Sequence, residues 1–227
     1  MSLIEFKNIT KTYNEKSAVD QVTFSIDPGE FVFLVGPSGA GKSTLVKMLI
    51  KEEVPSEGDI LFDGVSILDI LHEEVPNLRR KIGVVFQDFK LLDSKTVFDN
   101  VAVALEVVDA SEDDVKNIVP NVLGLVGLTD KKDAYPSQLS GGEKQRVAMA
   151  RAFAHEPDII VADEPTGMID PASSDEIMRI FEKVNSLGTS ILMATHDQNV
   201  VNKMKKRVVR IENGKITSDK QGGSYDG

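Results

Sequence analysis

Gly36-Pro37-Ser38-Gly39-Ala40-Gly41-Lys42-Ser43 directly follows the apolar run Phe31-Val32-Phe33-Leu34-Val35. The segment fits the pattern G-x-x-x-x-G-K-[ST], which is typical of a phosphate-binding loop. The apolar run is short and rich in β-forming residues, so it predicts a buried strand, and residues 43–51 predict a helix. A strand, this loop and a helix in that order are the context that the pattern requires.

The residue types of this loop suit a bound chain of phosphates. Glycine lets successive backbone N–H groups converge on phosphate oxygens, where a Cβ atom would crowd the ligand. The following helix directs its unpaired N–H groups and the positive end of its dipole at the same anion. Lys42 adds a positive charge for the outer phosphates, and the Ser43 hydroxyl can ligate Mg²⁺. A glycine-rich turn without a ligand is the alternative, but the flanking strand and helix favour a nucleotide site.

Length and composition are those of an ordinary globular protein. The chain has 227 residues, of which 41% are hydrophobic and 27% charged, so it can form one large domain or two small ones. It has no cysteine, which excludes disulfides and thiolate metal sites and suits a reducing cytosol. The formal net charge of −10 argues against a nucleic-acid-binding surface, which usually carries a basic excess.

Direct insertion into a membrane is not expected from the sequence. Residues 1–7 lack the apolar core of a signal peptide. No apolar run approaches the ~20 residues that a membrane-spanning helix needs. We therefore expect the protein to reach a membrane, if one is involved, through a partner.

Two strands are expected before the phosphate loop, at residues 4–13 and 22–26, and they predict a small antiparallel layer beside the nucleotide core. Tyr13 ends the first of them. Its ring can stack on the face of adenine, or it can be a half-buried residue at a strand end, and the sequence leaves both interpretations open.

A further buried strand is expected at residues 81–87, with Gln87 at its carboxyl end. Ligands of open α/β sheets lie outside the carboxyl ends of strands, so Gln87 is a candidate site residue, although alone it would be interpreted as a surface residue. The pattern from Asp88 to Ala154 is helical and predicts an insertion between α/β units. Pro120 predicts a kink or an early end in one of its helices.

A second group of candidate site residues is Leu139-Ser140-Gly141-Gly142-Glu143. Ser140 and Glu143 have capping-box spacing, so a well-capped helix accounts for them on its own. Two consecutive glycines behind a serine also leave a helix N-terminus open, with exposed N–H groups that can bind an anion. A protein with two such termini can hold a phosphate tail between them.

Two acids, Asp163 and Glu164, end the apolar strand expected at residues 158–164. Acids at the end of a buried strand are costly unless they meet a cation. Asp163 fits the acid that is linked to Mg²⁺ in P-loop ATPases, and Glu164 is placed to orient or deprotonate a water molecule.

His196 follows another buried strand, expected at residues 190–195. A lone histidine is usually structural, but one at the same sheet edge as Gln87 and Asp163 is a catalytic candidate. Between these strands, Asp170 precedes Pro171 and the two predict the start of a helix that ends before Gly188.

In this order and spacing, the motifs resemble those of the ATP-binding-cassette (ABC) ATPases over nearly the whole chain. The resemblance implies an α/β fold, a P-loop NTPase cassette with a RecA-like core, a small antiparallel β layer and a helical subdomain. We predict one domain over residues 1–217, with the helical subdomain at about 88–154, and a flexible tail over 218–227.

The resemblance also implies a site shared by two copies, in which the signature loop that contains Ser140 caps the ATP bound by the other copy. Glu164 would polarise the attacking water, His196 would contact the γ-phosphate, and the catalytic set would also include Lys42 and Gln87. Mg²⁺ would be attended by Ser43, Gln87 and Asp163. The residues that the resemblance assigns to ATP are Tyr13, Ser38, Gly39, Ala40, Gly41, Lys42, Ser43, Thr44, Gln87, Asp163, Ser140, Gly141, Gly142, Glu143 and Asp170, the last in the interface loop.

Two positions depart from the family pattern. Glu143 stands where many members have Gln, and Met168-Ile169 precede Asp170 where Asn-Leu is commoner. Neither departure removes a catalytic group, but both bear on how the shared site closes.

Within the family, residues 76–92, 96–102 and 192–197 resemble the FtsE-type ATPases of bacterial cell division. This resemblance implies a cytoplasmic subunit on the inner face of the cell membrane, bound to an FtsX-like integral membrane protein and signalling to cell-wall hydrolases. We expect Phe89, Leu91 and Leu92 to line the groove that receives the partner; packing under the helical insertion is the alternative.

The sequence leaves two alternative functions. Lipoprotein-release and macrolide-export ATPases share much of the same sequence pattern. A soluble ABC protein that acts on nucleic acid or the ribosome belongs to another class, and the acidic composition and single cassette argue against it.

Overall fold

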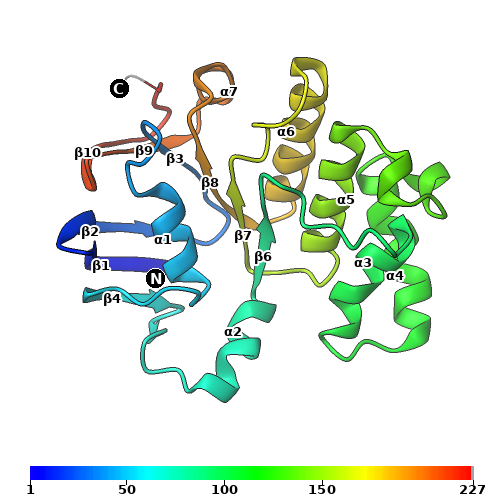
Figure 1. Cartoon of the computed structure of the whole chain (residues 1–227), viewed down its shortest axis with the longest axis horizontal. Helices are drawn as coiled ribbons and strands as arrows, with labels where there is room; N and C mark the ends of the chain where they lie inside the picture. The colour runs from blue at the N-terminus through cyan, green and yellow to red at the C-terminus, as the bar shows by residue number, and fades with distance from the viewer. Residues whose placement is uncertain (226–227) are drawn as a thin grey trace.

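Residues 1–225, which the computed structural model describes, contain a central sheet of five parallel strands and one antiparallel edge strand, in the order β10-β9-β3-β8-β7-β6 (Figure 1). The carboxyl ends of the parallel strands meet at one edge, where ligands bind in such sheets. The strands are β3 (Phe31–Val35), β6 (Ile82–Val85), β7 (Ile159–Asp163), β8 (Ser190–Thr195), β9 (Arg207–Glu212) and β10 (Lys215–Lys220).

A second sheet is antiparallel and has the order β2-β1-β4-β5, which confirms the predicted antiparallel layer. Its strands are β1 (Ile4–Tyr13), β2 (Lys16–Ile26), β4 (Glu57–Phe62) and β5 (Val65–Ser66). The rings of Phe6 and Phe24 stack across β1 and β2, with centroids 4.5 Å apart. β4 and β5 come from the segment after the first helix, so the layer is built from two separate parts of the chain.

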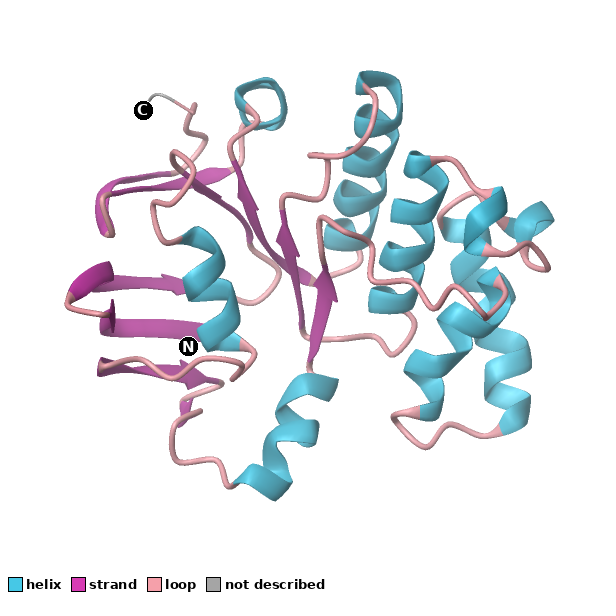
Figure 2. Cartoon of the chain, in the orientation of Figure 1, coloured by secondary structure: helices cyan, strands magenta, loops and turns pink. Residues whose placement is uncertain are grey.

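Strand β3 shows why the core has two halves. Its alternate residues Val32 and Leu34 face a cluster shared with the second sheet and α1 (Lys42–Leu49). Phe31, Phe33 and Val35 face a cluster shared with the helices on the other side (Figure 2). A strand buried on both faces reads as a continuous apolar run, as this one does.

The remaining helices lie mostly on the side of the sheet away from β1 and β2 (Figure 1). The predicted helical insertion contains α3, α4 and α5. The elements are η1 (His72–Glu74), α2 (Val75–Arg80), α3 (Val97–Glu106), α4 (Glu112–Leu125), η2 (Thr129–Lys131), η3 (Pro136–Gln138), α5 (Gly141–Phe153), α6 (Pro171–Ser186) and α7 (Gln198–Met204).

Helix α4 continues through Pro120, so the prediction of an early end there is wrong. The ring removes the N–H that would bond the carbonyl of Lys116. Pro120 and Lys116 are both exposed, so water can take the place of the missing donor. Val119 and Leu123 are buried on the opposite face and hold the helix against the core.

Residues 218–225 belong to the domain, so the predicted flexible tail is wrong for this part of 218–227. Residues 218–220 pair with β9 as part of β10. Tyr225 is buried, its N–H donates to Asn202 Oδ1 at 2.8 Å, and the Arg210 guanidinium lies 5.3 Å from its ring centroid. A single tyrosine among Gly, Ser and Asp has no periodicity that could predict this packing. Residues 226 and 227 of the predicted tail lie outside the described residues.

Candidate nucleotide site

The phosphate loop is built around two glycines whose conformations exclude a side chain. Gly36 has φ of +152°, and a Cβ there would lie 2.0 Å from the carbonyl oxygen of Ile211. Gly41 has φ of +110°, and its Cβ would lie 2.6 Å from the Ala18 oxygen. The loop therefore packs directly against β9 and β2. At Gly39 a Cβ would meet nothing within 4 Å, so that position faces open space.

Lys42 lies inside the loop rather than in solvent. Its side chain is buried, and Nζ donates to the carbonyl oxygens of Gly36 at 2.8 Å and Pro37 at 3.2 Å. A buried ammonium that donates to two carbonyls of its own loop is a fixed positive charge at the start of α1. Ser43 and Thr44 follow it in the first turn of the same helix.

Asp163 ends β7 beside this helix, and its carboxylate is suited to a cation. Burial raises the pKa of Asp163, and a hydrogen bond from Ser43 opposes the rise. Its Oδ1 is buried and has no hydrogen-bond partner in the described part of the chain. An orphaned carboxylate oxygen next to a serine hydroxyl fits Mg²⁺, which takes oxygen ligands and usually only one or two from carboxylates. No group of three or more acidic, His or Cys side chains forms a metal cage within residues 1–225.

Glu164 brings three elements together at the sheet edge. Its Oε1 lies 2.8 Å from His196 Nδ1 and 3.7 Å from Lys42 Nζ. Its backbone N–H donates to Ala194 O at 2.8 Å, which fixes it beside β8. Glu164 has φ of +49°, a left-handed conformation that non-glycine residues adopt mainly at constrained, often functional positions. Glu164 thus contacts two other predicted residues, Lys42 and His196.

Gln87 follows β6 at the same edge and is exposed. A Cβ placed on Gly167 would lie 2.9 Å from Gln87 Nε2, so the amide lies directly against the loop after Glu164. The sequence patterns did not single out Gly167. Its position could have indicated it, because it comes three residues after Glu164, in a loop that runs close to another candidate residue, Gln87.

Ser140 caps α5 as the capping-box spacing predicts. Its hydroxyl accepts from the Glu143 N–H at 3.2 Å, and its own N–H donates to Glu143 Oε2 at 2.8 Å. This bond lowers the pKa of Glu143. A Cβ on Gly142 would lie 2.6 Å from Ser173 Oγ, so the signature loop packs on the start of α6.

The signature loop and the phosphate loop stay apart within one chain. In Figure 1, the N-termini of α1 and α5 lie at the same edge of the central sheet, with strands β8 and β7 between them. The structure therefore brings Ser140, Gly141 and Gly142 near α6 and not near Lys42. A phosphate cannot be held between the two helix N-termini of a single copy.

Asp170 and Tyr13 lie at the start of α6 and at the end of β1, respectively. Asp170 caps α6, accepting from the N–H groups of Ala172 at 3.1 Å and Ser173 at 3.0 Å, and hydrogen bonding to Ser173 lowers its pKa. Tyr13 is 41% exposed at the end of β1, and Lys11 Nζ lies 5.0 Å from its ring centroid. Burial and the neighbouring Glu53 raise the pKa of Tyr13, while Thr44 at the start of α1 opposes the rise, so the hydroxyl lies near the start of that helix.

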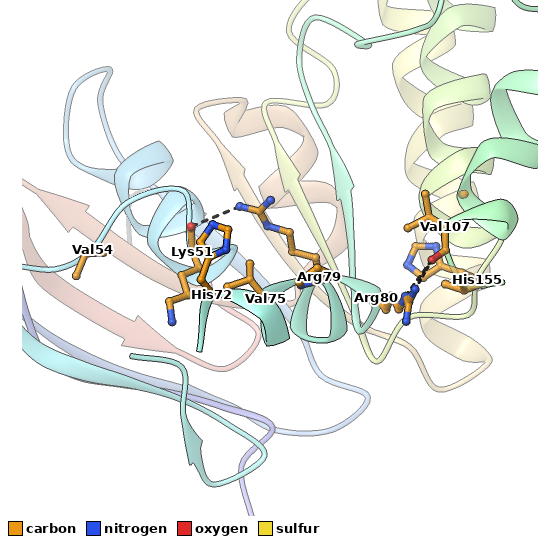
Figure 3. A pocket seen from close by; sticks show the side chains of 11 residues that line it. Lys51, Val54, His72, Val75, Arg79, Arg80, Val107 and His155 are labelled. Atoms are coloured by element: carbon orange, nitrogen blue, oxygen red, sulfur yellow. Dashed lines mark hydrogen bonds between the residues drawn. The ribbon is translucent and has the colours of Figure 1, made fainter. Parts of the chain in front are cut away.

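An apolar groove lies beside α2, away from the residues that follow Gln87. It has a volume of about 660 Å³ and runs between α2 and the end of α3 (Figure 3). Phe89, Leu91 and Leu92 are not among its lining residues, and their contact with a partner stays a prediction. Leu91 packs against the helical core. The lining residues are Lys51, Val54, His72, Val75, Pro76, Arg79, Arg80, Ala104, Val107, Val108 and His155.

Comparisons with known proteins show the family of the chain. Residues 19–167 match the model of the ABC transporter family. The chain is 50% identical over 224 residues to the cell division ATP-binding protein FtsE of Bacillus subtilis, covering 98% of each chain. It is 46% identical over 215 residues to FtsE of Escherichia coli K12, covering 94% of this chain and 97% of that one.

Two similar solved structures are dimers. One is an ATP-binding cassette in a post-hydrolysis state bound to ADP and Pi, with a TM-score of 0.88 and 33% identity. The other is a bacterial ABC transporter cassette, with a TM-score of 0.88 and 35% identity. Both matches cover 97% of this chain and 99% of the other.

Proposed function

We propose a residue-level role for this chain on the premise that it belongs to the ABC transporter family of ATPases, as its motifs predicted. Family and cassette fold are thus confirmed. The chain is an ATP-hydrolysing enzyme, and its identity to FtsE proteins supports an ATP-binding subunit of an ABC complex in cell division. We further propose roles for the site residues, a membrane partner and a cellular function.

In the proposed mechanism, Lys42 and the backbone of residues 38–44 bind the β- and γ-phosphates of ATP. Glu164 accepts a proton from the attacking water while the water oxygen bonds to the γ-phosphorus and the bond to the β-phosphate oxygen breaks. His196, held by Glu164, binds the γ-phosphate. The observation that carries this assignment is the contact of one carboxylate with both Lys42 and His196.

Mg²⁺ fits the oxygen atoms of Ser43 and Asp163, with Gln87 as the third proposed contact. When bound there it would neutralise charge on the phosphates. The protein contributes by presenting these oxygens at the edge of the sheet. The buried, unpartnered Asp163 Oδ1 supports this assignment.

Two copies complete each site in this proposal. Ser140, Gly141 and Gly142 of one copy cap the ATP held by the other, with Asp170 in the interface and Tyr13 stacked on adenine. The separation of α5 from α1 within one chain supports a shared site, as do the dimeric cassettes that the chain resembles (Figure 1).

The proposed membrane partner is an FtsX-like integral membrane protein, through which the subunit is held at the inner face of the membrane and signals to cell-wall hydrolases. Within residues 1–225, none of the helices is both long and apolar enough to cross a bilayer.

The groove beside α2 is the docking site that we propose, and the predicted region after Gln87 is the alternative. Its described lining combines apolar side chains with the cations Lys51, Arg79 and Arg80 and contains no carboxylate (Figure 3). In a chain with a net charge of −10, a basic apolar groove suits an amphipathic helix with acidic flanks.

We expect Val107→Asp to reduce recovery of the membrane partner by at least about tenfold, because it puts a charge on the apolar wall of the groove. Val65→Asp is the matched control, since Val107 is 57% and Val65 61% exposed and Val65 lies on β5 outside the groove. The tagged chain is purified from detergent-solubilised native membranes, and integral membrane proteins are identified by mass spectrometry. Equal recovery with Val107→Asp would refute the docking site, and recovery of an exporter subunit instead of an FtsX-like protein would refute the partner.

A further inference from the structure

The loop that contains Gln87 is held by helix α5 on both sides of that residue. Before Gln87, the buried side chain of Gln145 directs Nε2 at the Phe86 carbonyl oxygen at 3.4 Å. After it, Arg151 donates from one guanidinium nitrogen to Phe89 O at 3.0 Å and from another to Lys90 O at 2.7 Å. The contacts join residues about sixty positions apart in the sequence.

The part of the loop that Arg151 holds is strained. Phe89 has φ of +57° and Lys90 φ of +49°, and two consecutive non-glycine residues rarely adopt the left-handed region. The Lys90 N–H also donates to Asp88 O, two residues back, at 2.6 Å. Such a turn persists only where its surroundings impose it. Here Arg151 donates hydrogen bonds to the carbonyl oxygens of both residues of the turn.

The guanidinium of Arg151 is well suited to this task. Burial lowers the pKa of Arg151, but a guanidinium stays charged in proteins. Its two bonds are therefore charge-assisted and come from one planar fork, which fixes the positions of two carbonyls relative to each other. A lysine would carry the same charge without that geometry.

The far end of the loop is anchored separately. The fully buried Asn100 of α3 accepts from the Leu92 N–H at 2.8 Å and donates to Leu92 O at 3.1 Å. Gln87 therefore lies between the weak contact at Phe86 and the strong one at residues 89 and 90. Release of the Arg151 contact would free the strained side of Gln87 while Leu92 stays in place.

We propose that Arg151 is a positioning residue for Gln87, which couples the loop of one nucleotide site to the signature helix. Arg151 lies near the C-terminus of α5, whose N-terminus carries Ser140. Any movement of that helix that brings Ser140 onto the nucleotide of the other copy moves the anchor of Gln87 as well. This inference rests on the proposed role of Gln87 in the site and names the residue that controls it.

Arg151→Met should lower kcat for ATP hydrolysis by about 10- to 100-fold, the usual cost of misplacing a group from outside the reacting centre, and change KM for ATP by less than about threefold. Arg151→Lys should recover part of kcat, because it keeps the charge and one donor nitrogen but not the fork of the guanidinium. In the nucleotide-free full chain, Arg151→Met should also raise amide hydrogen exchange in residues 86–91 by about tenfold or more. Exchange in β7 should stay as in the wild type.

Arg146→Met is the control for the exchange measurement. Arg146 lies on the same helix but pairs with Glu176 of α6, so exchange in residues 86–91 should not change. Unaltered exchange of that segment in Arg151→Met would overturn the proposal, and so would an unaltered kcat. Gln87→Ala separates the role of Gln87 in the site from the anchoring of its loop by Arg151. Wild-type kcat in Gln87→Ala would refute the role of Gln87, whereas the exchange result for Arg151→Met tests the anchor itself.

Discussion

Replacing Glu164 by glutamine should lower kcat for ATP hydrolysis by about 100- to 10,000-fold, the usual contribution of a positioned general base. The amide keeps the shape of the side chain and can still hydrogen-bond His196, but it cannot take a proton from water. Lys42 would lose its carboxylate neighbour at 3.7 Å and keep its two loop carbonyls. ATP binding should therefore persist, and ATP-bound dimers should accumulate.

Steady-state phosphate release measures the first effect, and size-exclusion chromatography with ATP and Mg²⁺ measures the second. Glu182→Gln is the control, because Glu182 is an exposed carboxylate on α6. Wild-type turnover in Glu164→Gln would refute the role given to this residue. Loss of turnover without a stable dimer would agree with Glu164 as the general base but would refute the accumulation of an ATP-bound dimer.

Lys42→Met should weaken ATP binding by about 10- to 100-fold, the value of one or two hydrogen bonds to a charged group, and abolish measurable hydrolysis. The methionine keeps the apolar stem in the buried position and removes the only charge that the loop itself supplies. Titration of the nucleotide by calorimetry gives the affinity. Lys47→Met is the matched control on the same helix, since Lys47 is exposed. Equal affinities for the wild type and Lys42→Met would contradict the phosphate site.

Local pattern was enough to predict the strand–loop–helix unit and the strand-end acids. Val32 and Leu34 face one core and Phe33 the other, so an unbroken apolar run was the correct sign of a strand between two layers. The position of Asp163 and His196 at one edge of the sheet was predictable, because parallel neighbours end at the same edge. The contact between Glu164, which follows Asp163, and His196 follows from the pairing of β7 with β8.

Long-range contacts were beyond the reach of sequence patterns. Arg151 looks like one more cation on a helix, and nothing in its spacing points to the carbonyls of residues 89 and 90. The groove beside α2 draws its lining from four separate segments, so no single apolar run predicted it. Phe89 and Leu91 were conspicuous in sequence, yet the structure uses Leu91 for packing.

The pocket shared between copies is tested most directly by pairing two inactive chains, one with Lys42→Met and one with Ser140→Arg. In each mixed pair, one pocket carries both changes and the other combines an unaltered Lys42 with an unaltered Ser140. We predict that mixing restores ATP hydrolysis that neither variant shows alone. No hydrolysis in a preparation shown by native mass spectrometry to contain mixed pairs would contradict the shared pocket.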